Sequence, residues 1–536
     1  MTTVDAVVIG AGPNGLAGAN LLADRGWDVL LLEANDDPGG AVRTGEVTAP
    51  GFRNDLYSAF YPLAAVSPVI SGLHLEDHGL RWVHAPHVLA HVRPDGPAAV
   101  LDRDPDVTAA SLDRDAPGDG DAYLRLHAWW ERVSGPLVHG LLTPFPPVVG
   151  GARLAAATLG RDARATARLA LMPLHRMVEE HFRGESARLL YAGSALHADL
   201  TPDSAASALF GWLMVGLGQQ VGFPVPEGGA DQLIAAMARR LEAAGGQLRT
   251  GARVERVLVA DGRASGVVVA GGEEVRVRRA VLADTHVLDL YRHLVGERHL
   301  PPAVVEAMDR FQPGSGTIKV DWALSGPIPW ADEAARRAGT VHVGDSLDEL
   351  TVTSTDLDRN RIPADPFLLI GQMTTTDPTR SPPGTESAWA YTHVPQETRA
   401  DSGPDGLTGR WDADELATFA ARMEARIERL APGFGALVLA RAVAGPHELE
   451  ASNANLHGGD IGGGTAQLHQ QLLFRPLGAA GKGRAETPIR GLYLASSSAH
   501  PGGGVHGACG ANAARAAVAH DRLARVKATL RDHLPL

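Results

Sequence analysis

The sequence predicts an α/β fold in which a Rossmann-type nucleotide-binding domain is combined with a discontinuous α+β domain. Three observations support this prediction. A strand–turn–helix–strand pattern occupies the first 33 residues. A similar pattern of short strands and helices returns near residue 224, and the chain ends with a strand, a glycine-rich loop and a helix. Two long stretches without this pattern separate them, so the chain is expected to enter one nucleotide-binding domain three times.

The first pattern begins with a buried strand. Residues 4–9 are mostly apolar and β-branched, which favours a strand covered on both faces. Residues 16–24 have a helical spacing of apolar side chains, and Gly26 stands where a helix C-terminus favours glycine. Residues 29–32 form a second apolar strand that ends at Glu33. Together these elements predict a β-turn-α-β unit.

Changes in the predicted pattern of strands and helices divide the chain into five segments. Residues 1–84, 223–289 and 486–536 are assigned to the nucleotide-binding domain, and residues 85–222 and 290–485 to the second, substrate-binding domain. In the later nucleotide-binding segments we expect helices at 231–244 and 512–525, and short strands at 247–250, 254–259, 265–269, 274–278, 280–282 and 491–494.

The second domain is expected to be partly helical. Residues 121–133 and 152–182 have helical patterns, whereas residues 290–480 show no regular period. Residues 204–226 carry no charge and approach the length of a membrane span. Two glutamines and two prolines within this stretch argue against a span, so we expect a buried helix that ends near Gly216 and lines an apolar cavity.

Composition limits the classes of partner and compartment. The net charge is −13, which disfavours a nucleic-acid partner. The single cysteine, Cys509, allows neither an internal disulfide nor a thiolate metal site, which fits a reducing compartment. The N-terminus enters a strand without a signal-peptide pattern. We therefore expect a cytoplasmic protein, with membrane association left open.

The loop after the first strand has the dinucleotide-binding pattern Gly10-Ala11-Gly12-Pro13-Asn14-Gly15. Gly10 permits a tight turn, Gly12 lets the backbone approach a pyrophosphate, and Gly15 lets helix and strand pack closely. Glu33 can accept hydrogen bonds from a ribose. Together with Pro13, Asn14 and Ala34, these residues form the expected nucleotide site, which suits NAD or FAD.

A second glycine pair lies in Gly39-Gly40-Ala41-Val42-Arg43. Its position shortly after Glu33 lets the chain run along an extended cofactor, where Arg43 would pair with a phosphate. A surface turn with a solvated arginine is the alternative, and spacing alone does not separate the two.

The third glycine-rich loop, residues 499–507, lies between a strand and a helix near the C-terminus. Its consecutive glycines Gly502, Gly503 and Gly504 allow backbone N–H groups to face a ligand closely. The pyrimidine edge of a flavin is a suitable acceptor because reduction places negative charge there. A flexible linker is the alternative, which the flanking strand and helix disfavour.

These motifs resemble those of the phytoene-desaturase-like flavoproteins, which include carotenoid desaturases, desaturase-like ketolases and pyridine-nucleotide-disulfide-oxidoreductase-domain proteins. The resemblance spans nearly the whole chain and includes Pro226-Glu227-Gly228-Gly229 and residues 492–514. Three motifs look like the uncharacterised and ketolase-like branch: Asn453-Ala454-Asn455, Gly458-Gly459-Asp460-Ile461 and Phe474-Arg475-Pro476. One departure is Ala495, where the family's strand often ends in glycine.

The resemblance implies an FAD-binding domain of the glutathione-reductase type and particular contacts to FAD. Val254 is expected to pair through its backbone with adenine. Gly503, Gly504 and Val505 are expected to lie at the flavin. Only one dinucleotide pattern is present, so a second, nicotinamide cofactor is not expected.

The leading functional hypothesis is an FAD-dependent oxidoreductase that desaturates an apolar, isoprenoid- or lipid-like substrate by hydride transfer to flavin. A ketolase or isomerase of the same family is one alternative. A non-catalytic escort protein is another, since GDP-dissociation inhibitors resemble this fold without using flavin. The intact glycines and Glu33 argue against the escort protein.

The catalytic residues are not evident from the sequence. His500 and His506 flank the third glycine loop and are candidates for orienting substrate or moving a proton, although structural histidines explain them equally well. Cys509 is expected to pack the last helix rather than to link flavin covalently. No metal site is expected, because Pro86 interrupts the spacing of the histidines His84, His87 and His91.

A run of arginines interleaved with apolar residues raises the question of lipid contact: Arg153, Arg161, Arg164, Arg168 and Arg176. A basic amphipathic surface touching a bilayer is one interpretation. A solvated helix face is the other, and the one we favour. The oligomeric state is not predicted.

Overall fold

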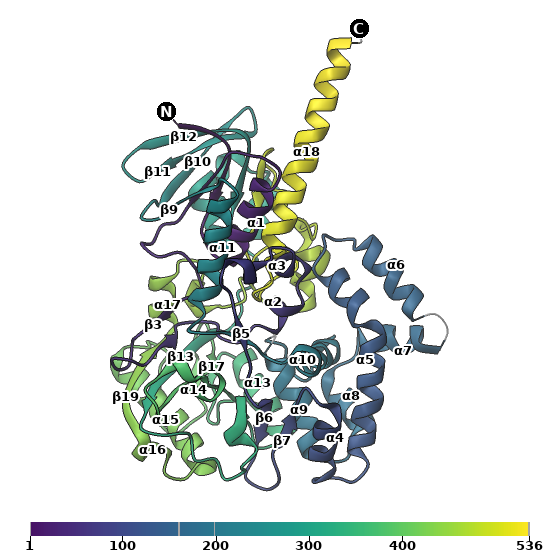
Figure 1. The fold of residues 1–536 in the computed structure, drawn as a ribbon, viewed down its shortest axis with the longest axis vertical. Coiled ribbons are helices and arrows are strands. Elements are labelled where there is room, and N and C mark those ends of the chain that lie inside the picture. Colours follow the sequence, from purple (N-terminus) through teal and green to yellow (C-terminus); the bar gives the residue numbers. More distant parts are fainter. Residues whose placement is uncertain (1, 159–160, 198, 534–536) are drawn as a thin grey trace.

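Two seven-stranded sheets organise the chain, and each is built from segments far apart in the sequence. The computed structural model describes residues 2–158, 161–197 and 199–533. In Figure 1 the first sheet lies at the top beside the long C-terminal helix, the second sheet lies below it, and a group of helices lies beside the second sheet.

The first sheet belongs to the nucleotide-binding domain. Its order is β10-β11-β12-β1-β2-β9, with β20 paired to β12, and β1 lies parallel to both β12 and β2. The strands are β1 (Thr2–Ile9), β2 (Val29–Leu32), β9 (Gln247–Arg249), β10 (Val254–Ala260), β11 (Arg263–Val269), β12 (Glu273–Ala283) and β20 (Leu492–Leu494).

One prediction for this sheet was wrong. Residues 273–283 form the single strand β12 rather than two strands. The first part of β12 is half-exposed and pairs antiparallel with β11, whereas residues 280–283 are fully buried between β1 and β20. The burial of the side chains therefore changes within β12. In the sequence, this change looks like the end of one strand and the start of another.

Three helices cover the first sheet: α1 (Pro13–Ala23), α11 (Asp231–Ala243) and α18 (Ala508–His533). The helix α1 begins three residues earlier than predicted, because Pro13 occupies the first helical position, which suits its fixed φ. It crosses α18 so closely that a Cβ on Gly510 would lie 1.7 Å from the Asn14 carbonyl oxygen. The C-terminal part of α18 projects beyond the body (Figure 1).

The second sheet has the order β19-β13-β17-β16-β14-β6-β7. Its strands are β6 (His87–Val92), β7 (Ala99–Leu101), β13 (Gly316–Leu324), β14 (Ala338–Val343), β16 (Leu368–Gln372), β17 (Glu386–Val394) and β19 (Val438–Ala444). The sequence showed no period here because β13 and β14 are buried along their whole length, which removes the alternation of polar and apolar residues.

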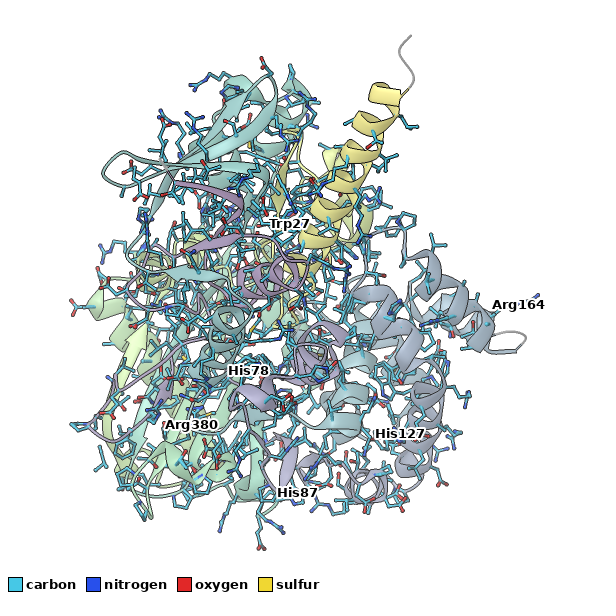
Figure 2. All side chains as sticks on the ribbon, turned by 45° about the horizontal axis from the view of Figure 1, so that its top comes forward. Trp27, His78, His87, His127, Arg164 and Arg380 are labelled. Carbon is cyan, nitrogen blue, oxygen red and sulfur yellow. The ribbon has the colours of Figure 1, made fainter. Side chains whose placement is uncertain are left out.

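Helices pack around this sheet and give the α+β character that was predicted. The longer ones are α4 (Pro105–Asp113), α5 (Asp119–Leu141), α6 (Val148–Ala157), α7 (Arg161–Leu169), α8 (Leu174–His181), α9 (Glu185–Leu196), α10 (Ser207–Val221), α13 (Leu347–Asp358) and α15 (Ala413–Leu430). Arg164 points outward from α7 at the edge of the molecule (Figure 2).

Shorter elements complete the fold. The helices are α2 (Pro62–Val66), α3 (Pro68–Ser71), α12 (Pro302–Met308), α14 (Met373–Thr376), α16 (Phe434–Leu437) and α17 (Pro446–Ser452). The paired short strands are β3 (Thr44–Gly45) with β4 (Asn54–Asp55), β5 (Trp82–Val83) with β8 (Val225–Pro226), and β15 (Arg361–Ile362) with β18 (Ala400–Asp401). Tight helical turns include η2 (Asp289–Val295) and η6 (His457–Gly459).

The buried helix α10 differs from its prediction at its C-terminal end. It starts at Ser207 and continues to Val221, past Gly216. Gly216 does not end the helix but makes room for a neighbour, since a Cβ there would lie 2.3 Å from the buried Trp130 ring. None of the helices in the described part of the chain has the length and apolarity of a membrane span.

The strands of each sheet come from the segments expected for its domain. Strands of the first sheet lie within residues 1–84, 223–289 and 486–536, and those of the second within 85–222 and 290–485. The exact boundaries between the segments stay a prediction.

Candidate cofactor and substrate site

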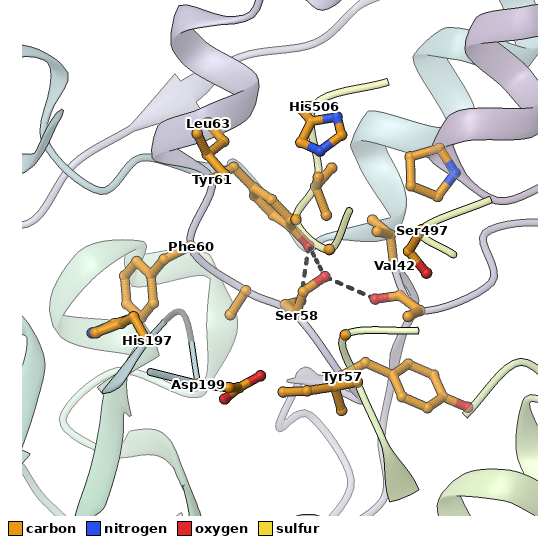
Figure 3. Close-up of a pocket in the computed structure, with 18 of the residues that line it drawn as sticks. Val42, Tyr57, Ser58, Phe60, Tyr61, Leu63, His197, Asp199, Ser497 and His506 are labelled. Atoms are coloured by element: carbon orange, nitrogen blue, oxygen red, sulfur yellow. Dashed lines mark hydrogen bonds between the residues drawn. The ribbon is translucent and has the colours of Figure 1, made fainter. Parts of the chain in front are cut away.

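Both terminal glycine-rich loops line one cavity of about 400 Å³ between the two sheets. Figure 3 shows part of its wall, with His506 of the C-terminal loop. Gly12 and Gly504 lie in its wall, although they are far apart in the sequence. Such a volume is within the range of roughly 300–1,000 Å³ that small-molecule sites occupy. The predicted site residues that line it are Gly12, Pro13, Asn14, Gly40, Gly503, Gly504, Val505 and His506.

The first loop joins β1 to α1 and needs its glycines. Gly10 has φ +92°, and a Cβ on Gly15 would lie 2.0 Å from the Gly10 carbonyl oxygen. Gly12 immediately precedes α1, and it lines the cavity together with Pro13 and Asn14, the first two residues of the helix. This arrangement suits a phosphate, because the helix N-terminus offers donors and a positive dipole end.

Glu33 ends β2 beside this loop. Its buried carboxylate accepts hydrogen bonds from Ala11 N–H at 2.8 Å and Asn35 N–H at 2.9 Å. Neither Glu33 nor the half-buried Ala34 is among the residues that line the cavity. Val254, the first residue of β10, also lies outside the cavity wall. Their contacts to a nucleotide stay predictions.

The second glycine pair runs along the first loop. Gly39 N–H donates to the Ala11 carbonyl at 2.9 Å, and Gly40 lines the cavity. Arg43 has partners within the protein: its guanidinium donates to the Tyr57 hydroxyl and, at 2.9 Å, to the Ser452 carbonyl. Arg43 is not in the cavity wall, so its pairing with phosphate stays a prediction.

The third loop brings His506 to the cavity. Its Nδ1 accepts a hydrogen bond from the Ala508 N–H at 3.0 Å, and its Nε2 is buried without a hydrogen-bond partner. Burial lowers the pKa of His506 to about 4, so the imidazole is neutral and Nε2 carries the proton. A buried donor left unsatisfied in the cavity wall fits a ligand acceptor.

His500 and Cys509 lie outside the cavity wall. His500 Nε2 is 2.9 Å from the Thr143 carbonyl oxygen, and burial lowers the pKa of His500 to about 4. The Cys509 thiol is directed at the carbonyl of Ala499 at 3.5 Å. Both therefore bond to backbone, which fits the structural role for His500 and the packing role for Cys509.

Asp284 is a site residue that sequence reasoning missed. It follows β12, lines the cavity and accepts a hydrogen bond from the Gly15 N–H at 2.8 Å. The available signal was its position at the carboxyl end of a buried parallel strand, where ligands bind in open α/β sheets.

Lys319 was missed as well. This buried residue of β13 lines the cavity, and its ammonium group bonds to Asp321 at 2.5 Å and lies 5.7 Å from the Trp389 ring centre. It is the single Lys or Arg among the described residues of the cavity wall. A rare lysine in an apolar segment was the signal that could have identified it.

The motifs of the ketolase-like branch shape the cavity wall. The buried guanidinium of Arg475 donates to the carbonyls of Gly462 at 2.8 Å and Ser497 at 2.7 Å. Asp460 accepts hydrogen bonds from the N–H groups of Gly462 and Gly464 at 2.7 Å each. These bonds hold a glycine-rich segment against the third loop, where a Cβ on Gly503 would lie 3.2 Å from Gly462.

Three potential metal ligands, His286, Asp289 and His457, meet outside the cavity within 4.8 Å. Protein contacts engage part of this group: His457 Nε2 is 2.8 Å from Asp289 Oδ2, and Leu288 N–H donates to His286 Nδ1, whereas His286 Nε2 is buried without a hydrogen-bond partner. The expectation that the chain has no metal site stays a prediction.

Comparison with known proteins identifies the family. The profile of NAD(P)-binding Rossmann-like domains matches residues 8–93, and that of flavin containing amine oxidoreductases matches residues 162–518, more than half of the chain. A likeness to the solved structure of cyclohexylamine oxidase from Brevibacterium oxydans IH-35A supports the fold, with a TM-score of 0.58 at 18% identity over 97% of this chain and 99% of that one.

Relatives of nearly equal length support the same assignment. The chain is 28% identical to pyridine nucleotide-disulfide oxidoreductase domain-containing protein 2 of Mus musculus, over 95% of this chain and 92% of that protein. It is 28% identical to hydroxyneurosporene desaturase of Cereibacter sphaeroides, over 93% and 94% of the two chains.

The comparisons indicate FAD as the cofactor. The glycine-rich loops in the cavity wall, the N-terminus of α1 and the unpartnered Nε2 of His506 fit bound FAD. The fit of these residues to FAD favours an enzyme over a non-catalytic escort protein. The chain belongs to the flavin containing amine oxidoreductase family and is an FAD-dependent oxidoreductase.

Proposed function

We propose that this enzyme dehydrogenates an apolar, isoprenoid- or lipid-like substrate, with carbon–carbon desaturation as the leading reaction. Bound FAD supplies the two-electron acceptor. One observation carries the proposal: the cavity that begins at the glycine loops extends to apolar side chains of the second domain. These are Phe60, Phe210, Leu213, Met214, Phe223, Leu369, Trp389 and Tyr391.

The charges in the cavity wall favour an apolar substrate over an amine. A carboxylate without another partner is one group that stabilises a buried ammonium ion. Asp199 is 2.6 Å from His393, and although burial lowers the pKa of His393, the Asp199 carboxylate outweighs burial and raises it. The carboxyl group of Asp284 is held by Gly15 N–H. The described wall therefore offers no free carboxylate to an amine.

Within this proposal the protein supplies shape, orientation and two polar groups. The aromatic wall excludes water and orients the substrate. Lys319 brings an ammonium group paired with Asp321 to the cavity wall, and His506 offers a neutral N–H donor. We assign no catalytic base.

Anaerobic mixing of the holoenzyme with apolar isoprenoid compounds tests the proposal. Bleaching of the flavin absorbance and a product lighter by two hydrogens are expected. A product that gains oxygen would indicate a ketolase, and a product of unchanged mass an isomerase. If amines bleach the flavin and no apolar compound does, the proposed substrate class is wrong.

A peripheral lipid contact through α6 and α7 belongs to the same proposal. Val148 and Leu171 are 72% and 70% exposed, next to the arginines of these helices. Arg168 is paired with Glu180 at 2.6 Å, as a solvated face would be. Flotation with vesicles containing anionic lipid distinguishes the two: co-flotation that V148D/L171D abolishes supports contact, and an enzyme that never floats excludes it.

A further inference from the structure

Asp284 brings a carboxyl group to the part of the nucleotide-binding loop that suits a phosphate. The residue is 7% exposed and lines the cavity. Its Oδ2 accepts the Gly15 N–H in the first turn of α1 at 2.8 Å. A Cβ on Gly12 would lie 2.8 Å from the same oxygen. A side chain of the protein therefore already occupies the donor end of this helix.

The charge state of this carboxyl group decides whether it opposes or supports FAD. An ionised carboxylate beside a pyrophosphate repels it, and this repulsion is strong in a buried site. A neutral carboxylic acid has both an acceptor and a donor. It can keep the bond from Gly15 and donate its own O–H to a phosphate oxygen.

We propose that Asp284 binds FAD as a neutral carboxylic acid, accepting the Gly15 N–H and donating its O–H to the pyrophosphate. The group thereby connects the helix N-terminus to the cofactor. FAD retention should then depend on pH, with protonated Asp284 as the binding form.

The surroundings favour the neutral form. Burial raises the pKa of Asp284 to about 7, the Gly15 N–H opposes this rise, and the nearby Glu33 carboxylate adds to it. Two other titratable groups lie close and are neutral near pH 7, because burial raises the pKa of Cys509 to about 12 and lowers that of His286 to about 3.

Charged groups on the other elements around the cavity already have partners. Lys319 on β13 bonds to Asp321, and Asp199 pairs with His393. The first turn of α1 carries no acidic residue. Glu33 is thus the charged neighbour that acts on Asp284 most directly.

Release of FAD from the holoenzyme tests this role independently of substrate. Release is followed by the recovery of flavin fluorescence after dilution, at about pH 6 and about pH 8.5, on either side of the Asp284 pKa. For the wild type we expect release to be roughly tenfold faster at the higher pH. Asp284→Asn should release FAD slowly at both pH values, because an amide keeps one acceptor and one donor. Asp284→Ala should release it rapidly at both.

Glu386→Gln is the matched control. Glu386 is also buried, burial raises its pKa to about 7, and it lies in β17 outside the cavity wall. This variant should follow the wild-type profile. The proposal is overturned if Asp284→Ala retains FAD as well as the wild type at about pH 6, or if Asp284→Asn keeps the wild-type dependence on pH.

Discussion

Among single residues, Arg380 forms a buried ion cluster that joins the two domains. Figure 2 labels the position of Arg380. Its guanidinium donates to both oxygens of Asp55 in β4 and, at 3.2 Å, to Asp377. Asp55 also accepts the Ala230 N–H at 2.9 Å, and Asp377 accepts the Gly228 N–H at 2.7 Å. Hydrogen bonds from the backbone around the Gly228–Gly229 motif to these carboxylates therefore link the motif to the second domain.

Arg380→Met should reduce the free energy of unfolding by about 3–5 kcal/mol, because it leaves two buried carboxylates without their cation. Urea unfolding followed by circular dichroism measures the change. Arg410→Met is the control, since the Arg410 side chain is 71% exposed and pairs with Asp412 at the surface. Equal midpoints for the two variants would show that the cluster contributes little.

Phe210 is a half-buried residue of α10 in the apolar part of the cavity wall. Phe210→Ala should raise KM for an apolar substrate by roughly tenfold, because removing the ring loses about 1.5–3 kcal/mol of apolar contact. FAD content should not change. Steady-state kinetics with the compound that bleaches the flavin measure the effect, and Leu439→Ala, at a 59% exposed position of β19, is the control. An unchanged KM would place the substrate elsewhere.

At the scale of elements, close packing between helices depends on glycines within them. From the sequence such a glycine is expected to mark the end of a helix, as Gly216 was. Gly216 in α10 lies against Trp130 of α5, which is 1% exposed and cannot move away. By contrast, a Cβ on Gly151 in α6 would meet no atom within 4 Å. The same substitution is therefore expected to have opposite effects in the two helices.

Gly216→Ala should lower the free energy of unfolding by about 1–3 kcal/mol through overpacking. Gly151→Ala should leave it unchanged or raise it by up to about 1 kcal/mol, because alanine favours the helix. Thermal unfolding of both variants measures the difference. A stabilised Gly216→Ala protein would contradict the close contact between α10 and α5.

At the scale of the whole molecule, the buried histidines of the described residues make stability depend on pH. Burial lowers the pKa to about 4 in His91, His197, His500 and His506, to about 3 in His286, and well below the ordinary 6.5 in His342. The folded chain keeps these rings neutral between pH 6.5 and 4, whereas the unfolded chain protonates them. Their contribution to stability is therefore complete above pH 6.5 and is lost as the pH falls through this window.

Buried carboxyl groups act in the opposite direction, Asp284 and Glu386 among them. The folded-state pKa of Asp284 and of Glu386 is raised to about 7, so their contribution is complete at low pH and is lost as the pH rises towards 7. The six histidines outweigh Asp284 and Glu386, so these eight groups together should take up on the order of three protons on unfolding near pH 5.5. Urea midpoints at about pH 7.5 and about pH 5.5 should show lower stability at the lower pH. A double variant, Asp284→Asn with Glu386→Gln, should steepen the loss, and a higher midpoint at the lower pH would refute this account.

Local sequence determined the β1–α1–β2 unit, its glycine loop and the strand–loop–helix at the C-terminus, because each depends on neighbouring residues and on backbone geometry that glycine permits. The resemblance of these motifs to those of the phytoene-desaturase-like flavoproteins then predicted FAD as the cofactor and indicated the family. The strands of the second sheet could not be predicted in the same way, since β13 and β14 are buried on both faces and lack alternation.

The tertiary structure alone decided which polar groups share the cavity. Gly15 and Asp284 are separated by 269 positions yet share a hydrogen bond, and Lys319 reaches the same cavity from the second domain. It also separated His506, which lines the cavity, from His500, which bonds to backbone outside it. The physical reason is that strand pairing between distant segments sets these positions, and no spacing along the chain encodes that pairing.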